Sequence, residues 1–203
     1  MKRFSLIFIS LFVIACAWAQ NPLSVRIERE SPENIVGRAI ATWDGRSVIV
    51  SNNAIRAWWI GGMEMIVFYS SSDGAGGYEN EGQSLWRYDL TTGARRKLVT
   101  EYFVINKVAP VLSGRGRRVL LVSMADGGLG APHAAIADPI RGEVWRHRQA
   151  RFIGVRNGRV AIGIYRVSDI ESGRLSRPYR ILYLDLDTIL RRPASPYRPV
   201  LDR

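Results

Sequence analysis

Short apolar runs separated by tight, glycine-containing turns recur along most of this 203-residue chain. Asn157-Gly158 is the clearest of these turns, because it joins Phe152–Val155 to the apolar run Val160–Tyr165. Asn-Gly and Asp-Gly pairs favour the two-residue turns that connect antiparallel strands. Beyond the N-terminal segment, no long stretch combines helical periodicity with capping residues. The pattern therefore predicts an all-β fold.

Three further hairpins follow from the same pattern. They join Ala39–Trp43 to Ser47–Ser51, Ile55–Ile60 to Met63–Tyr69, and Val108–Leu112 to Arg118–Ser123. The Val119–Val122 run is apolar throughout, as expected of an inner strand that is buried on both faces.

In chain order, the second, third and fourth of these hairpins are each followed by a polar loop and by another strand that ends in aspartate. These strands end at Asp89, Asp138 and Asp185, and the first two then turn at Gly93 and Gly142 into a short, arginine-containing strand. The polar loops are predicted at Asp73–Gln83, Ala125–His133 and Ser168–Pro178. Such units recur at about the 40–50-residue spacing of four-stranded propeller blades. Residues 25–192 are thus predicted to form a β-propeller-like array of three to four four-stranded antiparallel blades, either complete or incomplete.

One segment, Tyr69–Thr100, resembles the repeat of TolB-like propellers of the Tol-Pal system and of related WD-like repeats in exported bacterial proteins. The residues that carry the resemblance are Ser71, Ser72, Asp73, Gly74, Leu85, Trp86, Tyr88, Asp89, Gly93, Arg96 and Leu98. It is good over that blade, loose over residues 103–192 and poor before residue 55. It implies a periplasmic or surface platform for protein contacts. Propellers have about four blades or more, so either the N-terminal strands complete a fourth blade or the chain is an open sector that pairs with another copy.

The N-terminal segment has the composition of a secretory signal. A basic start precedes a short apolar core, Leu6–Ile14, and Ala17–Ala19 offers small residues for cleavage before Gln20. The core is too short for a membrane-spanning helix, which takes about 20 apolar residues. We therefore expect residues 1–19 to be a signal peptide and the protein to be exported.

A second interpretation of the same segment concerns its cysteine. Val13–Cys16 resembles the bacterial lipobox, in which the cysteine is lipidated and becomes the first residue of the mature protein. Residues 1–15 would then be removed and Cys16 would be the lipid anchor. Both interpretations remain open, and they predict a protein of the periplasm or outer membrane, or a secreted one. No intrachain disulfide is expected, because Cys16 is the only cysteine.

The chain has a net charge of +11, and nearly all of its positive charge is arginine. Arginine binds phosphate and carboxylate groups in bidentate fashion, so this bias suits an anionic partner. The alternative is the codon usage of a GC-rich genome. The tail at 193–203 is rich in proline and arginine and is predicted to be extended or loose.

Hairpin turns of a four-stranded meander emerge at alternate ends, which predicts that many arginines gather at one end of the array. The candidates for contact with an anionic surface are Arg95, Arg96, Arg115, Arg117, Arg118, Arg156 and Arg159. They suit a membrane surface or an acidic protein. Nucleic acid is disfavoured, because no aromatic residues interleave them. The alternative is that arginine simply keeps these turns soluble.

We find no catalytic constellation in the sequence. Two histidines are too few for a zinc site, and no Gly-x-Ser-x-Gly elbow occurs. The loop after the Ile55–Tyr69 hairpin holds weak calcium candidates whose spacing fits no established calcium loop, namely Asp73, Glu79, Asn80 and Glu81. No metal, cofactor or catalytic residue is therefore expected.

Two functions from different classes follow. The first is a non-enzymatic binding or scaffold module of the cell envelope that contacts a protein partner and self-associates if the propeller is open. The alternative is a glycan-binding or hydrolytic propeller with its site in the acidic, tryptophan-rich first blade. Aromatic residues packed between blades would favour the first function, and exposed ones the second.

Overall fold

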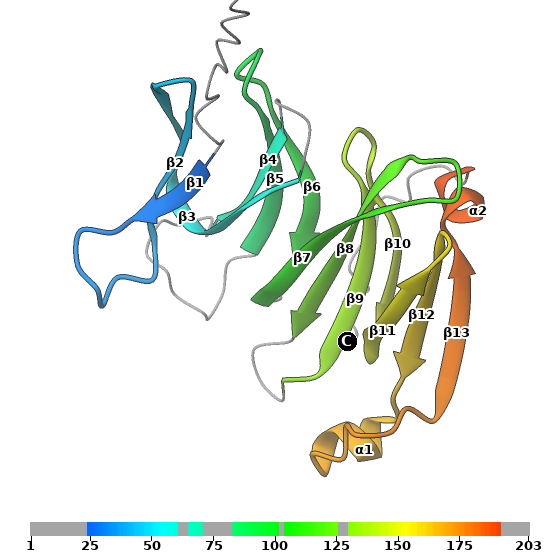
Figure 1. Cartoon of the computed structure of the whole chain (residues 1–203). Helices are drawn as coiled ribbons and strands as arrows, with labels where there is room; N and C mark the ends of the chain where they lie inside the picture. The colour runs from blue at the N-terminus through cyan, green and yellow to red at the C-terminus, as the bar shows by residue number, and fades with distance from the viewer. Residues whose placement is uncertain (1–23, 61–64, 71–82, 102–103, 126–129, 192–203) are drawn as a thin grey trace, which may run out of the picture.

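The computed structural model describes residues 24–60, 65–70, 83–101, 104–125 and 130–191 (Figure 1). Every pairing between strands in these ranges is antiparallel. The strands are β1 (Ser24–Glu28), β2 (Gly37–Trp43), β3 (Arg46–Trp59), β4 (Met65–Ser70), β5 (Gln83–Asp89), β6 (Arg95–Glu101), β7 (Val104–Leu112), β8 (Arg118–Ala125), β9 (Pro132–Asp138), β10 (Gly142–Arg148), β11 (Ala150–Arg156), β12 (Arg159–Ile164) and β13 (Arg180–Asp185). The prediction of an all-β fold is confirmed.

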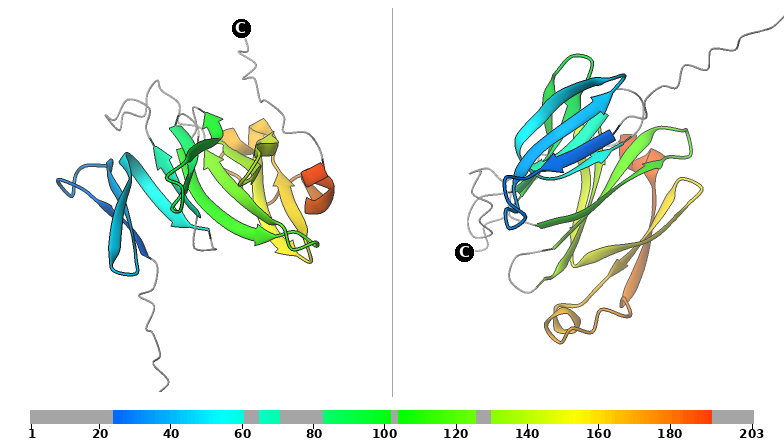
Figure 2. Two further views of the ribbon diagram at one scale, coloured as in Figure 1. Left: turned by 90° about the horizontal axis from the view of Figure 1, so that it is seen from above. Right: turned by 60° about the vertical axis from the view of Figure 1, so that its left-hand side comes forward.

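The strands follow one another in four sheets. Hydrogen bonding is continuous from β1 to β6, but the long strand β3 pairs with β2 through its first half and with β4 through its second half. We therefore call β1, β2 and the first half of β3 the first sheet, and the rest of β3 with β4–β6 the second sheet. The third sheet is β7–β10 and the fourth is β11–β13. The first and fourth sheets lie at opposite ends of the array, which does not close (Figures 1 and 2).

Strand β3 corrects the predicted break between Ser51 and Ile55. The chain stays extended there, and register shifts on both sides of Ala54 allow it to leave one sheet and enter the next. A second correction is the strand count, because the fourth sheet has three strands rather than four.

Each pair of neighbouring sheets shares an apolar core. Strand β8 in the third sheet shows the arrangement most clearly, since Leu120 and Val122 face the second sheet while Val119 and Leu121 face the fourth. Burial on both faces of this strand confirms the prediction made from its uninterrupted apolar run. A smaller cluster around Val50 and Tyr88 joins the first and second sheets.

Two short helices lie where the sequence predicts a loop and a strand, respectively. Helix α1 (Val167–Glu171) lies within the segment predicted as a polar loop, and α2 (Leu186–Arg191) follows β13 where a fourth strand was expected. The side chain of Asp185 accepts a hydrogen bond from the Thr188 amide at 2.7 Å, as a helix-capping aspartate does. Neither helix is long enough to cross a membrane, and the described residues contain no other candidate for a span.

Candidate interaction surface

The turns at one end of the array come together. The β5–β6, β7–β8, β9–β10 and β11–β12 turns and helix α2 all lie along the upper edge in Figure 1, whereas α1 lies at the opposite edge. We call the upper edge the basic end, because it carries the seven arginines predicted to meet an anionic surface. These four described turns therefore share the edge to which the alternation of turns in the sequence assigns them.

Asp138 holds two of these turns in place. It ends β9 and is buried, with 3% of its surface exposed. One carboxylate oxygen accepts hydrogen bonds from the backbone amides of Ile140 and Arg141, at 2.8 and 3.2 Å. The other oxygen accepts hydrogen bonds from the Arg141 Nε at 2.9 Å and from the Arg117 Nη2 at 3.1 Å. Burial opposes ionisation of Asp138, but these hydrogen bonds outweigh it and lower its pKa. Asp138 therefore acts as the internal counter-ion of the β7–β8 and β9–β10 turns.

Aspartates at the equivalent strand ends in the second and fourth sheets also cap the next turn. Asp89 accepts the amides of Thr91 and Thr92, both at 3.0 Å, and the Thr92 amide makes the largest contribution to its lowered pKa. The hydrogen bond from the Thr188 amide likewise lowers the pKa of Asp185. The strand-ending aspartates found in the sequence are thus turn caps, a local role that aspartate favours.

A second carboxylate joins the β7–β8 turn to helix α2. Asp187 accepts the Ser113 hydroxyl at 2.6 Å and the Arg115 backbone amide at 3.0 Å. The β11–β12 turn packs against the same place, where Gly158 contacts the backbone of Gly114. Three segments that are distant in the sequence are therefore locked together at the basic end.

The seven predicted arginines fall into two groups. Arg117 pairs with Asp138, Arg96 donates to the Arg141 carbonyl at 3.2 Å, and Arg118 is half-buried. The side chains of the others are exposed and make no hydrogen bond or ion pair within the described ranges: Arg95, Arg115, Arg156 and Arg159. Arg95 lies over the Tyr88 ring, 5.8 Å from its centre, and Arg159 lies near the carboxylate of Asp185. The first group is structural, and the second is open to a partner.

The sequence did not predict that Asp138 and Asp187 belong to this surface. It showed Asp138 as one of three aspartates at strand ends, without showing that this residue binds two turns. Nothing in the sequence pairs Asp187 with Ser113, 74 residues away. Both carboxylates are used inside the protein, which leaves the exposed arginines as the dominant charge of this end.

Other predicted features lie elsewhere. The weak calcium candidates (Asp73, Glu79, Asn80 and Glu81) and the lipidation candidate Cys16 fall outside the described residues. Trp59, Trp86 and Tyr88 pack between the first and second sheets, as expected of core aromatics. His133 is buried within β9, whereas the sequence had placed it in a loop, because the strand begins earlier, at Pro132.

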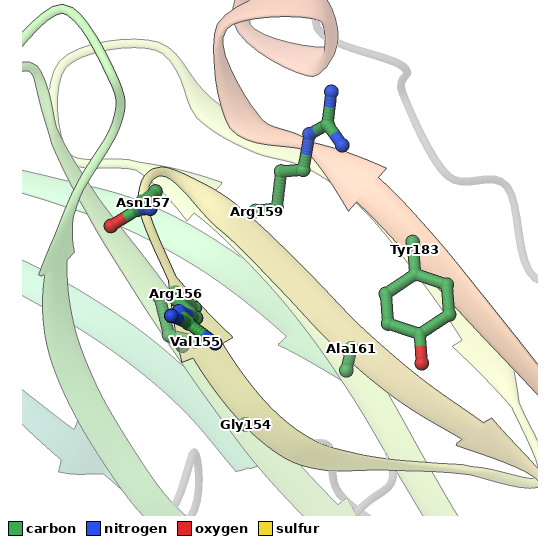
Figure 3. A pocket seen from close by; sticks show the side chains of 7 residues that line it. All are labelled: Gly154, Val155, Arg156, Asn157, Arg159, Ala161 and Tyr183. Carbon is green, nitrogen blue, oxygen red and sulfur yellow. The ribbon is translucent and has the colours of Figure 1, made fainter.

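The outer face of the fourth sheet carries a hollow of about 660 Å³. Its lining residues are Gly154, Val155, Arg156, Asn157, Arg159, Ala161 and Tyr183 (Figure 3). Gly154, Ala161 and Tyr183 lie side by side across the three strands, so two small residues leave space beside one large ring. The sequence did not reveal this hollow, because it depends on register.

The chemistry of these surfaces suits binding. They present guanidinium groups and apolar area, and in the part of the chain that the structure describes no three His, Cys, Asp or Glu side chains gather as a metal site. Comparisons with protein-family models, with curated proteins and with solved structures found no match. The geometry of the chain itself therefore carries the functional interpretation.

Proposed function

We propose that this chain is a non-enzymatic, propeller-like binding module of the exported cell envelope, and that its basic end contacts an anionic surface or an acidic protein. The observation that carries the proposal is the way Asp138 and Asp187 tie the β7–β8 turn, the β9–β10 turn and helix α2 together. Internal carboxylates hold this end, while Arg95, Arg115 and Arg156 remain exposed on it.

The propeller-like interpretation rests on repetition. Successive sheets share apolar cores face to face, and three of the four sheets place a capping aspartate at the same strand end. In this interpretation the four sheets are consecutive blades of an open sector. A rigid stack of this kind presents its turns as one fixed surface, which suits recognition by a broad partner.

Electrostatics supports a contact of moderate strength. Charges are screened over about 8 Å at physiological ionic strength, so only arginines held close together act jointly. Each arginine near an anionic membrane contributes about 1 kcal/mol. The exposed arginines of the basic end would therefore orient the protein on such a surface rather than hold it there permanently.

Charge reversal at matched positions tests the proposal. We expect the triple variant Arg95→Glu, Arg115→Glu and Arg156→Glu to bind phosphatidylglycerol-containing vesicles at least about tenfold more weakly than the parent at low salt. The control reverses Arg38, Arg174 and Arg177, which are exposed and lie away from the basic end, and it has the same net charge. Binding by the control should stay near the parent value, and pure phosphatidylcholine vesicles should bind none of the proteins.

Equal loss in the triple variant and in the control would contradict the proposal, because net charge alone would then explain binding. None of the three reversed basic-end side chains donates a hydrogen bond within the described residues. In the control, Arg174 donates one exposed hydrogen bond to the Ser172 hydroxyl, which contributes little to stability. Urea unfolding of both variants should therefore stay close to the parent, which separates a binding defect from a folding defect.

A further inference from the structure

The fourth sheet exposes large apolar side chains on its outer face, the face turned away from the third sheet. Ile153 on β11 is 52% exposed, and Ile181 and Tyr183 on β13 are 45% and 71% exposed. This sheet is the last of the array, so no further sheet of the described residues packs on that face (Figures 1 and 2). A group of exposed apolar side chains on one sheet face marks an interaction surface.

Strand register places opposite charges on the two flanking strands of this face. Arg156, Arg159 and Asp185 form a row across β11, β12 and β13, next to the β11–β12 turn. Their neighbours Val160 and Leu184 pack toward the third sheet, so the alternation of side chains along a strand directs this row outward. Figure 3 shows Arg159 directed toward α2. The row is therefore positive on β11, at Arg156, and negative on β13, at Asp185.

The next row combines a hollow with a projecting ring. Gly154, Ala161 and Tyr183 lie side by side in register, and the hollow lies over the two small residues (Figure 3). A Cβ atom at position 154 would meet no other atom within 4 Å. At one level along the strands, the face thus has open space over β11 and a large exposed ring on β13.

The third row is apolar. Ile181 stands opposite Gly163 in register, and the side chains of Ile153 and Pro178 both lie 3.0 Å from the place of a Cβ atom at that glycine. This row thus has one exposed isoleucine from β13 and another from β11. Both would lose water contact if a second apolar surface covered them.

The three rows complement themselves under a two-fold rotation. An axis that runs along β12, in the plane between two such faces, brings β13 of one copy over β11 of the other and each row over its own equivalent. Carboxylate then meets guanidinium, ring meets hollow and isoleucine meets isoleucine: Asp185 with Arg156, Tyr183 with Gly154, and Ile181 with Ile153. Each contact occurs twice. Charge and shape therefore both fit a second copy of this chain.

We propose that the protein forms a two-fold homodimer through the outer faces of its fourth sheets, with the Tyr183 ring of each copy in the hollow over Gly154 of the other. The interface covers one face of a three-stranded sheet, so we expect a weak dimer with a dissociation constant of about 10–100 µM. The outer face of the first sheet lacks this match, because its Arg26 and Glu28 pair with each other.

This inference goes beyond the function proposed above and does not require it. It has a consequence for that function, because an axis along the strands leaves both β11–β12 turns at the same end of the dimer. The two basic ends would then face one anionic surface together, and two linked weak contacts bind more tightly than one.

Charge exchange between two variants tests the pairing by sedimentation of the full chain. Arg156→Glu opposes two acidic side chains and Asp185→Arg opposes two basic ones, so each variant alone should associate at least about tenfold more weakly than the parent. An equal mixture restores both pairs of opposite charge and should dimerise within about threefold of the parent. Arg38→Glu makes the same charge change on the first sheet and should leave association unchanged.

Filling the hollow tests the packing independently of charge. Gly154→Gln should preserve the monomer, because its Cβ enters open space, but it occupies the place of the incoming ring. Gly154→Gln and Tyr183→Ser should each weaken association about tenfold. Ile49→Ser removes an exposed isoleucine from the first sheet and should have no effect. Asp185 also accepts the Thr188 amide, so Gly154→Gln answers the same question if Asp185→Arg fails to fold.

Four results would overturn the proposal. They are a parent that stays monomeric up to about 1 mM, folded charge variants whose mixture associates no better than either alone, a Gly154→Gln variant that dimerises like the parent, and growth beyond two copies, which a closed two-fold contact does not allow. Sedimentation uses no membrane, so its outcome is separate from that of the vesicle test of the basic end.

Discussion

Gly158 lies directly against the backbone of Gly114. A Cβ atom at position 158 would stand 2.3 Å from the Gly114 amide nitrogen, and Gly158 has a φ of +72°. Its carbonyl also accepts the Leu186 amide. This one residue therefore meets the demands of a left-handed turn, of close contact between two sheets and of the start of α2, and only glycine satisfies all three.

The first prediction compares two glycines with nearly the same φ. Gly116 has a φ of +73° but open space around its Cβ position. Gly116→Ala should cost about 1 kcal/mol of unfolding free energy from left-handed strain alone, whereas Gly158→Ala should cost about 3 kcal/mol because a backbone clash is added. Urea unfolding measures both values. Equal losses would show that the two turns do not touch in solution.

The second prediction concerns the ion pairs of Asp138. Asp138→Asn keeps an oxygen that can cap the turn but removes the charge that pairs with Arg117 and Arg141. We expect a loss of about 2 kcal/mol in unfolding free energy, because the carboxylate is buried. The control Asp89→Asn removes a carboxylate that is more accessible to water, with 16% of its side chain exposed against 4% for Asp138, and should lose less than about 1 kcal/mol. A smaller loss in the buried variant than in the control would contradict the role given to Asp138.

The third prediction is loss of stability in acid. The lowered pKa values of Asp89, Asp138 and Asp185 mean that the unfolded chain takes up their protons first as the pH falls. Their stabilisation is therefore complete above the unfolded pKa, near 4, and is lost as the pH falls through the folded values. Urea unfolding midpoints of the parent should accordingly drop between about pH 5 and pH 2.

Asp138→Asn provides the control for this acid effect. Burial raises the pKa of Glu143 against the opposing effect of Arg146, so its protonation stabilises the fold as the pH falls. Parent and variant share this opposite contribution from Glu143. The difference between their unfolding midpoints at each pH therefore reports the contribution of Asp138. The variant should show a shallower decline below pH 4, and parallel curves would mean that the Asp138 pKa is not lowered.

The fourth prediction distinguishes the two N-terminal interpretations. If Cys16 carries a lipid, Cys16→Ser should move the protein from the membrane fraction to the soluble fraction and abolish metabolic labelling with fatty acid. Cleavage before Gln20 predicts instead that the variant fractionates like the parent. N-terminal sequencing of the mature protein provides an independent measurement of the same choice.

The local features of the fold were readable from the sequence. Asp44-Gly45 and Asn157-Gly158 both adopt positive φ at their two positions, as two-residue hairpin turns require. Turn conformation depends on the Cβ atom and on hydrogen bonds within a few residues, so short motifs are sufficient to predict it. The apolar runs located most strands for a similarly local reason, the alternation of side chains along a strand.

The tertiary structure alone decided how the sheets meet. The contact between Gly158 and Gly114, the hydrogen bond from Ser113 to Asp187 and the hollow beside Tyr183 all depend on how neighbouring sheets and strands are aligned. That alignment follows from the combined shape of side chains on facing sheets, which no window of sequence contains. The sequence by itself thus determined the strands, their turns and the end of the array that carries arginine. Packing between sheets determined which arginines are held by carboxylates and which remain open to a partner.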